Sequence, residues 1–526
     1  MHENRETSEL SARGSGADRP EKAKSRTTGM NGTEESDCAI VPVNQPNKGE
    51  PLEGGLSAEV GEGEVRTEEN IRQTHTNPTQ GGTKGVSQGL AGVRQASRVR
   101  KGERFTALLH HLTPELLHSS FYALQREAAA GVDGVRWAEY EVGLAGRLAD
   151  LHGRVHRGAY RAQPSRRVYI PKADGRQRPL GVAALEDKIV QHAVVTILNE
   201  IYENDFLGFS YGFRPGRSQH QALDALTVGI TRKRVNWIVD LDIRGFFDNM
   251  SHEWTEKFVA HRVGDPRVLR LIRKWLRAGV SEDGEWSESK IGTPQGAVIS
   301  PLLANIYLHY ALDLWVAAWR RKVARGDMIV VRYADDVVLG FEHREEAERF
   351  LREVRERLAK FGLELHPEKT RLIAFGRFAA SNREKRGAGK PETFDFLGFT
   401  HICEKNGKTG YFVVGRKTVK KRMRAKLQAL KGELRRRMHA PIVETGEWLE
   451  KVVRGYYRYH AVPGNLARLG VFRERLIQLW RHVLRRRSQK RRPNWDRLSR
   501  HFDRWLPRPC LLHPFPQVRF DARYPR

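Results

Sequence analysis

The run "IVVRYADDVVLG", residues 329–340, places two adjacent aspartates, Asp335 and Asp336, between segments of β-branched residues. Such segments on either side of a short polar step predict two β-strands joined by a tight turn. An unpaired carboxylate is costly to bury, so this position indicates a turn that faces a cleft, with a charge partner or a metal ion. An Asp-rich turn without a catalytic role is the ordinary alternative. A metal site would need at least one more carboxylate from elsewhere in the chain.

A second pair of carboxylates stands in "IVDLDIRGFFDNM". The apolar start predicts a buried strand that runs into a helix, and because strand side chains alternate, Asp240 and Asp242 would face the same side. Magnesium binds carboxylate oxygens together with substrate phosphates, and two such ions about 4 Å apart can activate a hydroxyl and stabilise a leaving pyrophosphate. We therefore expect Asp242 to join Asp335 and Asp336 in one metal site. Asp240 has the alternative of pairing with a neighbouring arginine.

The positive charge of the chain is concentrated in its last quarter. Residues 401–526 hold 33 Lys and Arg against 9 Asp and Glu, which is +24 of a total formal charge of +29. Such a density is self-repelling unless a polyanion binds, and nucleic acid is the first candidate, before an anionic membrane surface. A solvated basic surface is the alternative. No apolar run of 18 residues is present, so no membrane span is expected.

The first part of the chain has a different composition. Residues 1 to about 95 are rich in Gly, Ser, Thr, Glu, Asn and Pro, with few aromatic residues, and we expect a disordered tail. The N-terminus lacks the apolar segment of a secretory signal. The 3 cysteines are far apart and form no C-x-x-C pair, which argues against a zinc ribbon or a disulfide framework and favours the cytosol.

Between these regions, helix and strand patterns alternate. Leucines at three- and four-residue spacing predict helices across residues 104–129, interrupted at Thr113-Pro114, where Thr113 can cap and Pro114 can open a second helix. "RRVYIPKADGRQRPLGV" predicts a β-hairpin around Ala173-Asp174-Gly175. From about residue 416 the pattern is helical and very basic. An α+β module followed by a basic α-helical domain is therefore expected.

The carboxylate segments belong to an ordered set of motifs. "VDLDIRGFFDN", "GTPQGAVISPLLANIYL" and "VRYADDVVL", in that order, resemble the A, B and C motifs of reverse transcriptases. "IPKADGRQRPLGV", "YGFRPGRS", "LHPEKTRLIAFG", "FDFLGF" and "LEKVVRGYYRYH" match further blocks. Together they resemble the bacterial group II intron-encoded reverse transcriptase/maturase family over roughly residues 100–526.

The resemblance implies roles for individual residues. Asp242, Asp335 and Asp336 match the metal-binding catalytic carboxylates, Asp335 being the expected direct ligand, and the backbone carbonyl of Ile243 would add an oxygen. The cofactor implied is Mg²⁺, two ions per site, with Mn²⁺ as a possible substitute. The residues that match nucleotide-binding positions are Lys172, Arg178, Phe247, Gln295 and Lys369.

Each nucleotide-binding position has an implied task and an ordinary alternative. Lys172 and Arg178 would grip the triphosphate, as an ammonium and a forked guanidinium can, or simply be solvated on the hairpin. Phe247 would exclude a ribose 2′-OH, although it could be a core residue. Gln295 would lie near nucleotide and template, with Gly292 and Gly296 permitting close backbone approach. Lys369 would protonate the leaving pyrophosphate, or simply be exposed.

Basic residues mixed with aromatic ones suit RNA, whose bases stack and whose phosphates pair with arginine. Core aromatics and solvated basic helices are the alternatives. The residues expected to bind nucleic acid are Arg214, Arg217, Arg454, Tyr456, Tyr457, Arg458, Arg485, Arg486 and Arg487.

The domains follow from the resemblance. The expected fold is a right-hand polymerase: fingers and an antiparallel palm sheet over 96–400, after the tail 1–95. An α-helical thumb/maturase region would span 401–490, and 491–526 would be a short basic nucleic-acid-binding extension. The end "LLHPFPQVRFDARYPR" lacks paired C-x-x-C zinc ligands, so no HNH endonuclease is expected.

The implied function is RNA-directed DNA synthesis for a group II intron. The expected partners are the intron RNA, an RNA template with a DNA primer, target DNA and dNTPs, with no membrane. The expected location is the bacterial cytoplasm, associated with nucleoid or ribonucleoprotein. Two alternatives remain open: a non-catalytic RNA-binding maturase, and a reverse transcriptase of host defence or diversity generation without an intron.

Overall fold

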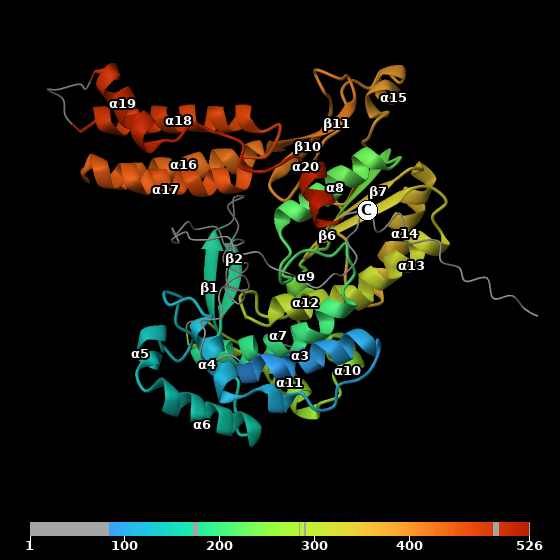
Figure 1. Cartoon of the computed structure of the whole chain (residues 1–526), viewed down its shortest axis with the longest axis vertical. Helices are drawn as coiled ribbons and strands as arrows, with labels where there is room; N and C mark the ends of the chain where they lie inside the picture. The colour runs from blue at the N-terminus through green and yellow to red at the C-terminus, as the bar shows by residue number, and fades with distance from the viewer. Residues whose placement is uncertain (1–83, 172–176, 283, 289–290, 488–493, 525–526) are drawn as a thin grey trace, which may run out of the picture.

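The computed structural model describes residues 84–171, 177–282, 284–288, 291–487 and 494–524. Helices and antiparallel sheets are mixed along these segments, and a helical bundle follows them. Figure 1 shows three parts: an N-terminal lobe at the bottom, a sheet-containing centre, and the bundle at the top left. The predicted fold class, an α+β right-hand polymerase fold followed by a helical domain, is confirmed.

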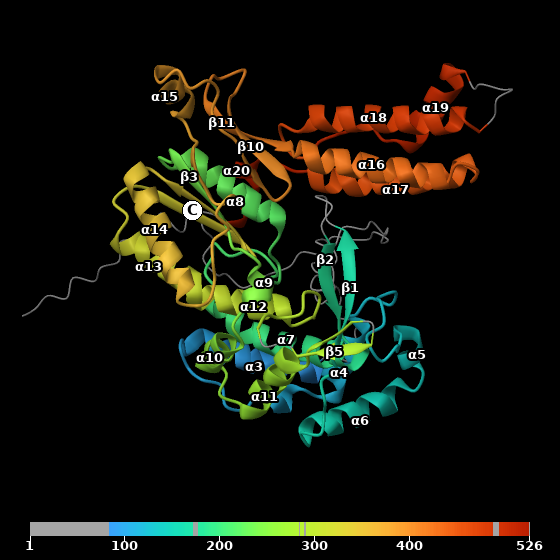
Figure 2. The ribbon, with the colours of Figure 1, turned by 180° about the vertical axis from the view of Figure 1, so that it is seen from behind.

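The N-terminal lobe is built around the apolar helix α7 (Leu185–Asp205), against which α3 and α4 pack. The hairpin of β1 (Ser165–Pro171) and β2 (Gln177–Val182) rises from this lobe toward the bundle (Figure 2), as predicted. The tip of the hairpin, residues 172–176, lies outside the described residues. The other elements of the lobe are α3 (Lys84–Val99), η2 (Leu109–His111), α4 (Pro114–Tyr122), α5 (Trp137–Glu141), α6 (Leu144–His156), α10 (His252–Arg262), α11 (Pro266–Arg277), β4 (Val280–Glu282) and β5 (Glu285–Ser287).

Two expectations for this lobe need correction. The boundary at residue 95 falls inside α3, whose buried Leu90 and Val93 pack on the core. The segment before Thr113 forms only the short turn η2, because the backbone N–H groups of Leu108 and Leu109 both donate to one carboxylate, that of Asp265. The predicted cap is confirmed: the Thr113 hydroxyl accepts from the Leu116 N–H, and α4 begins at Pro114.

The centre is a four-stranded sheet in the order β6-β7-β3-β8, against which α8 and α14 pack. A long helical rod, α12–η3–α13, contains a π-helical turn, η3, at its middle. The bounds of these elements are β3 (Trp237–Asp242), β6 (Met328–Tyr333), β7 (Asp336–Phe341), β8 (Arg371–Ala374), α8 (Gln219–Arg232), α9 (Phe246–Asn249), α12 (Ser300–Leu308), η3 (His309–Asp313), α13 (Leu314–Lys322), α14 (Arg344–Ala359) and α15 (Ala379–Lys385).

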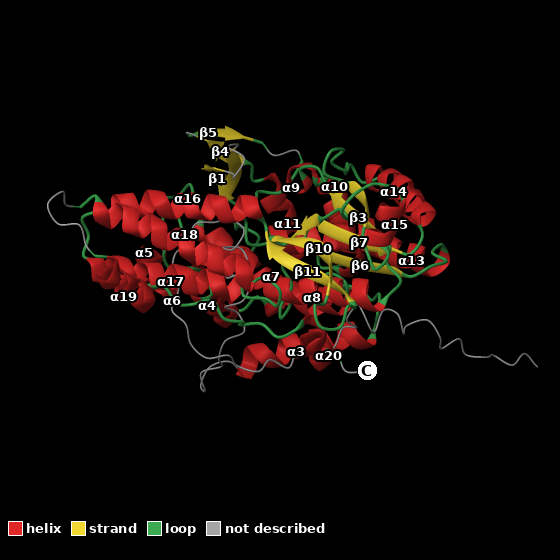
Figure 3. Ribbon diagram, turned by 90° about the horizontal axis from the view of Figure 1, so that it is seen from above, coloured by secondary structure: helices red, strands yellow, loops and turns green. Residues whose placement is uncertain are grey.

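The C-terminal part combines a small sheet with the bundle. The strand order is β11-β10-β9, and the bundle has its own apolar core. Figure 3 shows the helices of the bundle from above. The last helix, α20, leaves the bundle and packs on α8 of the centre. The bounds are β9 (Phe394–Phe396), β10 (Phe399–Lys405), β11 (Phe412–Thr418), α16 (Lys420–Arg436), α17 (Ile442–His460), α18 (Leu466–Arg485), α19 (Trp495–Trp505) and α20 (Pro516–Arg523). None of the helices in the described ranges has both the length and the apolar character needed to cross a bilayer.

Candidate functional site

The predicted hairpin of residues 329–340 is present. β6 and β7 pair so that Tyr333 lies opposite Asp336, which leaves Ala334 and Asp335 as the turn. On its other side β7 pairs with β3, and Asp242, the last residue of β3, lies opposite Asp336. Carboxylates about ninety residues apart in the sequence therefore meet at one end of the sheet. Asp335 is half-buried and Asp336 exposed.

The carboxylate of Asp242 has a cationic neighbour. The ammonium group of Lys369 donates to its Oδ2 at 3.1 Å and lies 3.4 Å from its Oδ1. No group of three or more His, Cys, Asp or Glu side chains in the described part of the chain is arranged as a ready metal cluster. The donor set is nevertheless suited to magnesium, because hard carboxylate oxygens from two neighbouring strands and a turn gather at this end.

Asp240 pairs with an arginine, the alternative to a metal-binding role. Its carboxylate accepts from Arg371 of the neighbouring strand β8, at 3.2 Å. Burial raises the pKa of Asp240 to about 6, against the opposing effect of this arginine. The sequence did not indicate Arg371 as this partner. Asp240 therefore has an arginine partner on β8, whereas Asp242 contacts Lys369.

A chain of hydrogen bonds joins the N-terminal hairpin to this end of the sheet. Arg178 on β2 donates to the Gln295 side-chain carbonyl at 2.8 Å, and the Gln295 amide donates to Asp248 at 3.1 Å. The Gly181 N–H also donates to the Gln295 backbone carbonyl at 2.7 Å. Two predicted nucleotide-binding residues, Arg178 and Gln295, are thus in direct contact, with Asp248 as a partner that the sequence did not indicate.

The two glycines beside Gln295 permit close backbone approach, as predicted. A Cβ on Gly292, which has a φ of +83°, would lie 2.8 Å from the Asp248 carbonyl oxygen. A Cβ on Gly296, with a φ of +114°, would lie 2.9 Å from the Gly181 carbonyl oxygen. Both positions therefore require glycine for conformation and for space.

The remaining predicted site residues differ in their surroundings. Phe247 is partly buried and packs on the main core, with its ring 5.4 Å from that of buried Phe246. Ile243 is buried and forms a bridge with Leu365. Lys172 lies outside the described residues.

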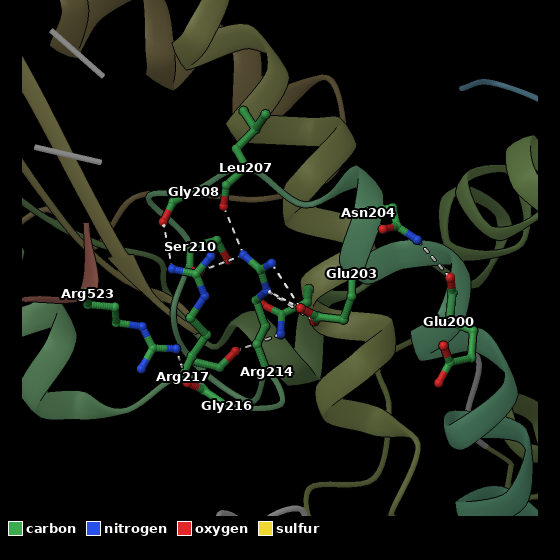
Figure 4. Close-up of polar contacts among 12 residues, drawn as sticks. Glu200, Glu203, Asn204, Leu207, Gly208, Ser210, Arg214, Gly216, Arg217 and Arg523 are labelled. Carbon is green, nitrogen blue, oxygen red and sulfur yellow. Dashed lines mark hydrogen bonds and ion pairs between the residues drawn. The ribbon is translucent and has the colours of Figure 1, made fainter. Parts of the chain in front are cut away.

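Arg214 and Arg217, both predicted to contact RNA, make their contacts within the fold (Figure 4). The Arg214 side chain is 1% exposed, pairs with Glu203 at 3.0 Å and donates to the backbone carbonyl of Ser210. Arg217 donates to the Tyr524 hydroxyl at 3.1 Å, and burial beside Arg214 lowers the pKa of its guanidinium. The aromatic and basic mixture in this loop therefore serves its own folding.

The bundle divides the predicted RNA-binding residues into two groups. Tyr457, predicted to bind RNA, is buried in the bundle core, where burial raises its pKa to about 12. Tyr456 stacks on Phe472 with ring centroids 4.1 Å apart. Arg487 donates to the Ala440 carbonyl. The second group is exposed on the bundle and consists of Arg454, Arg458, Arg485 and Arg486.

Within the extension 491–526, described residues make contacts with the rest of the protein. Residues of α19 belong to the bundle core, whereas Arg519 of α20 pairs with Asp224 and Asp521 pairs with Arg232 at 2.6 Å. These C-terminal charges are used in contacts with α8.

This sheet, with paired carboxylates at one end and a glycine-rich segment beside them, is that of a polymerase palm. Residues 170–401 match the family model described as reverse transcriptase (RNA-dependent DNA polymerase). The chain is 38% identical to protein YkfC of Escherichia coli (strain K12) over 239 residues, 40% of this chain and 62% of that protein. It is 35% identical to the group II intron-encoded protein LtrA of Lactococcus lactis subsp. cremoris over 238 residues, 45% of this chain and 39% of that protein.

A further relative is nuclear intron maturase 2, mitochondrial, of Arabidopsis thaliana, 32% identical over 109 residues, 20% of this chain and 15% of that protein. These matches place a reverse transcriptase domain at residues 170–401 and make the chain similar to group II intron-encoded proteins and intron maturases, in agreement with its motifs. The aligned segments span 62% or less of the length of these curated relatives.

Proposed function

We propose that this protein is an RNA-directed DNA polymerase of a group II intron. It extends a primer 3′-OH with dNTPs on an RNA template, and it binds its intron RNA to assist splicing and mobility. The observation that carries the polymerase function is the strand register, in which Asp242 lies opposite Asp336 with Asp335 in the adjoining turn. The family match and the relatives named after introns support the setting.

The proposed cation site uses the carboxylates of Asp242, Asp335 and Asp336 with the backbone oxygen of Ile243. Bound Mg²⁺ would supply Lewis acidity toward the hydroxyl and the phosphate. Arg178 would hold triphosphate oxygens with a guanidinium that Gln295 already orients at 2.8 Å. Phe247 would line the sugar position from the short helix α9, and Lys172, which lies outside the described residues, would act with Arg178 on the triphosphate.

The domain assignment follows this function. Fingers and palm would extend from α3 to β9, and the thumb/maturase region would begin at α16. Between them lie β10 and β11, of which β11 contacts α8 of the centre. The exposed arginines of the bundle, Arg454, Arg458, Arg485 and Arg486, would face structured RNA.

Primer extension on poly(rA)/oligo(dT) with Mg²⁺ tests the proposal. We expect wild-type protein to incorporate dTTP and Asp335→Asn to lose incorporation while retaining RNA affinity, because the change removes a metal ligand and leaves the basic surface intact. Normal extension by Asp335→Asn would remove that residue from the site. RNA binding without extension by the wild type would favour the non-catalytic maturase instead.

A further inference from the structure

Arg332 is a fully buried cation three residues before Asp335, and its guanidinium has two separate sets of partners. Its Nε and Nη2 donate to the two carboxylate oxygens of Asp313, at 2.8 and 2.6 Å. Its Nη1 donates to the Asn305 side-chain oxygen and to the Ala334 backbone carbonyl, each at 2.9 Å. One side of the guanidinium therefore forms an ion pair, and the other holds the backbone of the turn.

The turn that Arg332 holds has an uncommon conformation. Ala334 has a φ of +56°, in the left-handed region that residues with a Cβ rarely adopt. Such a residue persists where its surroundings over-determine it, and these positions cluster at active sites. Here the residue next in the chain is Asp335.

A neighbouring loop presses on the same turn. A Cβ on Gly212 would lie 2.3 Å from the Ala334 backbone nitrogen, so the two backbones are in close contact. Asn305 connects the two sides, because its amide donates to the Gly212 carbonyl at 2.8 Å while its oxygen accepts from Arg332. Tyr211 and Arg332 also share a backbone hydrogen bond of 2.8 Å.

The partners of Arg332 come from one helical rod. Asn305 lies in α12, and Asp313 ends the π-helical turn η3 that follows it. π-Helical turns are rare and are frequent at functional sites, because the inserted residue changes which side chains face inward. The loop that carries Gly212 is in turn held by Arg214, which donates to the Ser210 carbonyl, and by Arg217, which donates to the Gly208 carbonyl (Figure 4).

We propose that Arg332 is a positioning residue, which holds the Ala334–Asp335 turn, and with it the Asp335 carboxylate, in the geometry needed for catalysis. The inference rests on the proposed polymerase function of Asp335. A buried ion pair alone is a weak source of stability and is often replaceable by apolar residues. The ion pair with Asp313 uses only Nε and Nη2 of Arg332. The Nη1 group, which contacts Asn305 and Ala334, is therefore not needed for the ion pair.

Arg332→Lys separates the two roles. Lysine keeps a positive charge for Asp313 but lacks the second arm, since an ammonium cannot reproduce the fork of a guanidinium. Gly212→Ala acts from the other side: it leaves the ion pair intact and displaces the turn backbone. Gly340→Ala is the matched control, because Gly340 lies in the same sheet and its Cβ would meet the side chains of Ile329 and Val235, at 2.7 and 2.8 Å.

The readouts are hydrogen exchange of the peptide containing the turn, the Mg²⁺ concentration for half-maximal primer extension, and thermal unfolding. We expect Arg332→Lys and Gly212→Ala to exchange faster at the turn, to need several-fold more Mg²⁺ and to lose roughly 10- to 100-fold in kcat, since small misplacements of reacting groups are costly. Gly340→Ala should lower the melting temperature with wild-type Mg²⁺ dependence.

Exchange at the turn and Mg²⁺ dependence that match wild type in Arg332→Lys would overturn the inference, as would equal changes in Gly340→Ala. Should Arg332→Lys fail to fold, Gly212→Ala decides by the same criteria. If wild-type protein extends no primer, the proposed function fails separately. Hydrogen exchange then still decides: faster exchange at the turn in Gly212→Ala than in Gly340→Ala supports positioning, and equal exchange refutes it.

Discussion

The ammonium group of Lys369 and the carboxylate of Asp242 form an ion pair of 3.1 Å at the end of the palm sheet. Both side chains are partly exposed, 52% and 31% respectively, so the pair is weak, worth about 1 kcal/mol or less. A divalent cation that binds Asp242 would therefore displace or share the lysine at little cost. The pair also keeps beside Asp242 the ammonium group that the motif resemblance assigns as a proton donor.

Substitution of Lys369 tests its assignment as that proton donor. We expect Lys369→Met to lower kcat for nucleotide incorporation by about 10²-fold, the lower range for loss of a general acid. The Mg²⁺ requirement should fall, because the competing ammonium is gone. Single-turnover incorporation across a Mg²⁺ series measures both. A wild-type kcat with a reduced Mg²⁺ requirement would leave Lys369 only the role of a counter-ion.

Asp240 and Asp242 provide a matched pair on one strand. We expect Asp242→Asn to abolish primer extension, because it removes a proposed metal ligand. Asp240→Asn should retain most activity, since the Asp240 carboxylate already pairs with Arg371 at 3.2 Å. Steady-state extension with equal amounts of folded protein compares them. Equal losses in the two variants would contradict the separation of their roles.

Sequence periodicity sufficed for the hairpin and for the strand of Asp242, whereas the meeting of their carboxylates was predicted from the needs of a metal site and from the resemblance of the motifs. A side-chain period of two and a run of β-branched residues constrain strands strongly, and the order of the motifs indicated which strands meet. Asp242 opposite Asp336 is the result. The sequence left two interpretations of Asp240, a metal ligand or the partner of an arginine. The pairing of β3 with β8 places Arg371 opposite Asp240 and favours the second.

The arginines were the less predictable part. Residue type alone does not distinguish an exposed arginine from one saturated by the fold, and Arg214 and Arg332 belong to the second kind. Their partners, Glu203 and Asp313, stand outside the motifs that contain these arginines. Tertiary packing brings each pair together. Tyr457 shows the same limit for aromatics: its helical spacing fits a core face as well as an RNA surface.

His401 gives the fold a pH dependence. It is fully buried and stacks on Phe394, with ring centroids 4.8 Å apart, and burial together with nearby Arg416 lowers its pKa to about 3. Because the folded pKa lies below the unfolded value, the stabilisation from neutral His401 is complete above the unfolded pKa of about 6.5 and is lost as the pH falls toward 3.

His401→Phe should remove that dependence. At about pH 5, wild-type protein should have lost on the order of 2 kcal/mol of unfolding free energy relative to the variant, compared with neutral pH. Urea denaturation of both proteins at the two pH values measures the difference, and the contributions of other histidines cancel. An identical change with pH in both proteins would show that His401 does not titrate in this range.

The contact of α20 with α8 should contribute to stability. Asp224 is buried and pairs with Arg416 at 2.9 Å as well as with Arg519 of α20. We expect Arg519→Ala to lower the unfolding free energy by about 1–3 kcal/mol, because a buried charge loses a partner. Exposed Arg500 in α19 is the control, and Arg500→Ala should be near neutral. Equal melting temperatures for the two variants would exclude a stabilising role for α20.

The exposed arginines at the end of α18 should set the salt dependence of RNA binding. Arg485 and Arg486 are exposed next to residues 488–493, and replacing both with alanine should flatten the slope of log K against log salt by about 1 to 2, as each lost phosphate contact removes nearly one released counter-ion. Arg344→Ala/Arg349→Ala is a charge-matched control, because these two arginines already pair with Glu348 and Glu353 on α14. Fluorescence anisotropy with a structured RNA over a KCl series measures the slope. A slope that is unchanged in the Arg485/Arg486 variant, or reduced equally in the control, would remove the end of α18 from the RNA-binding surface.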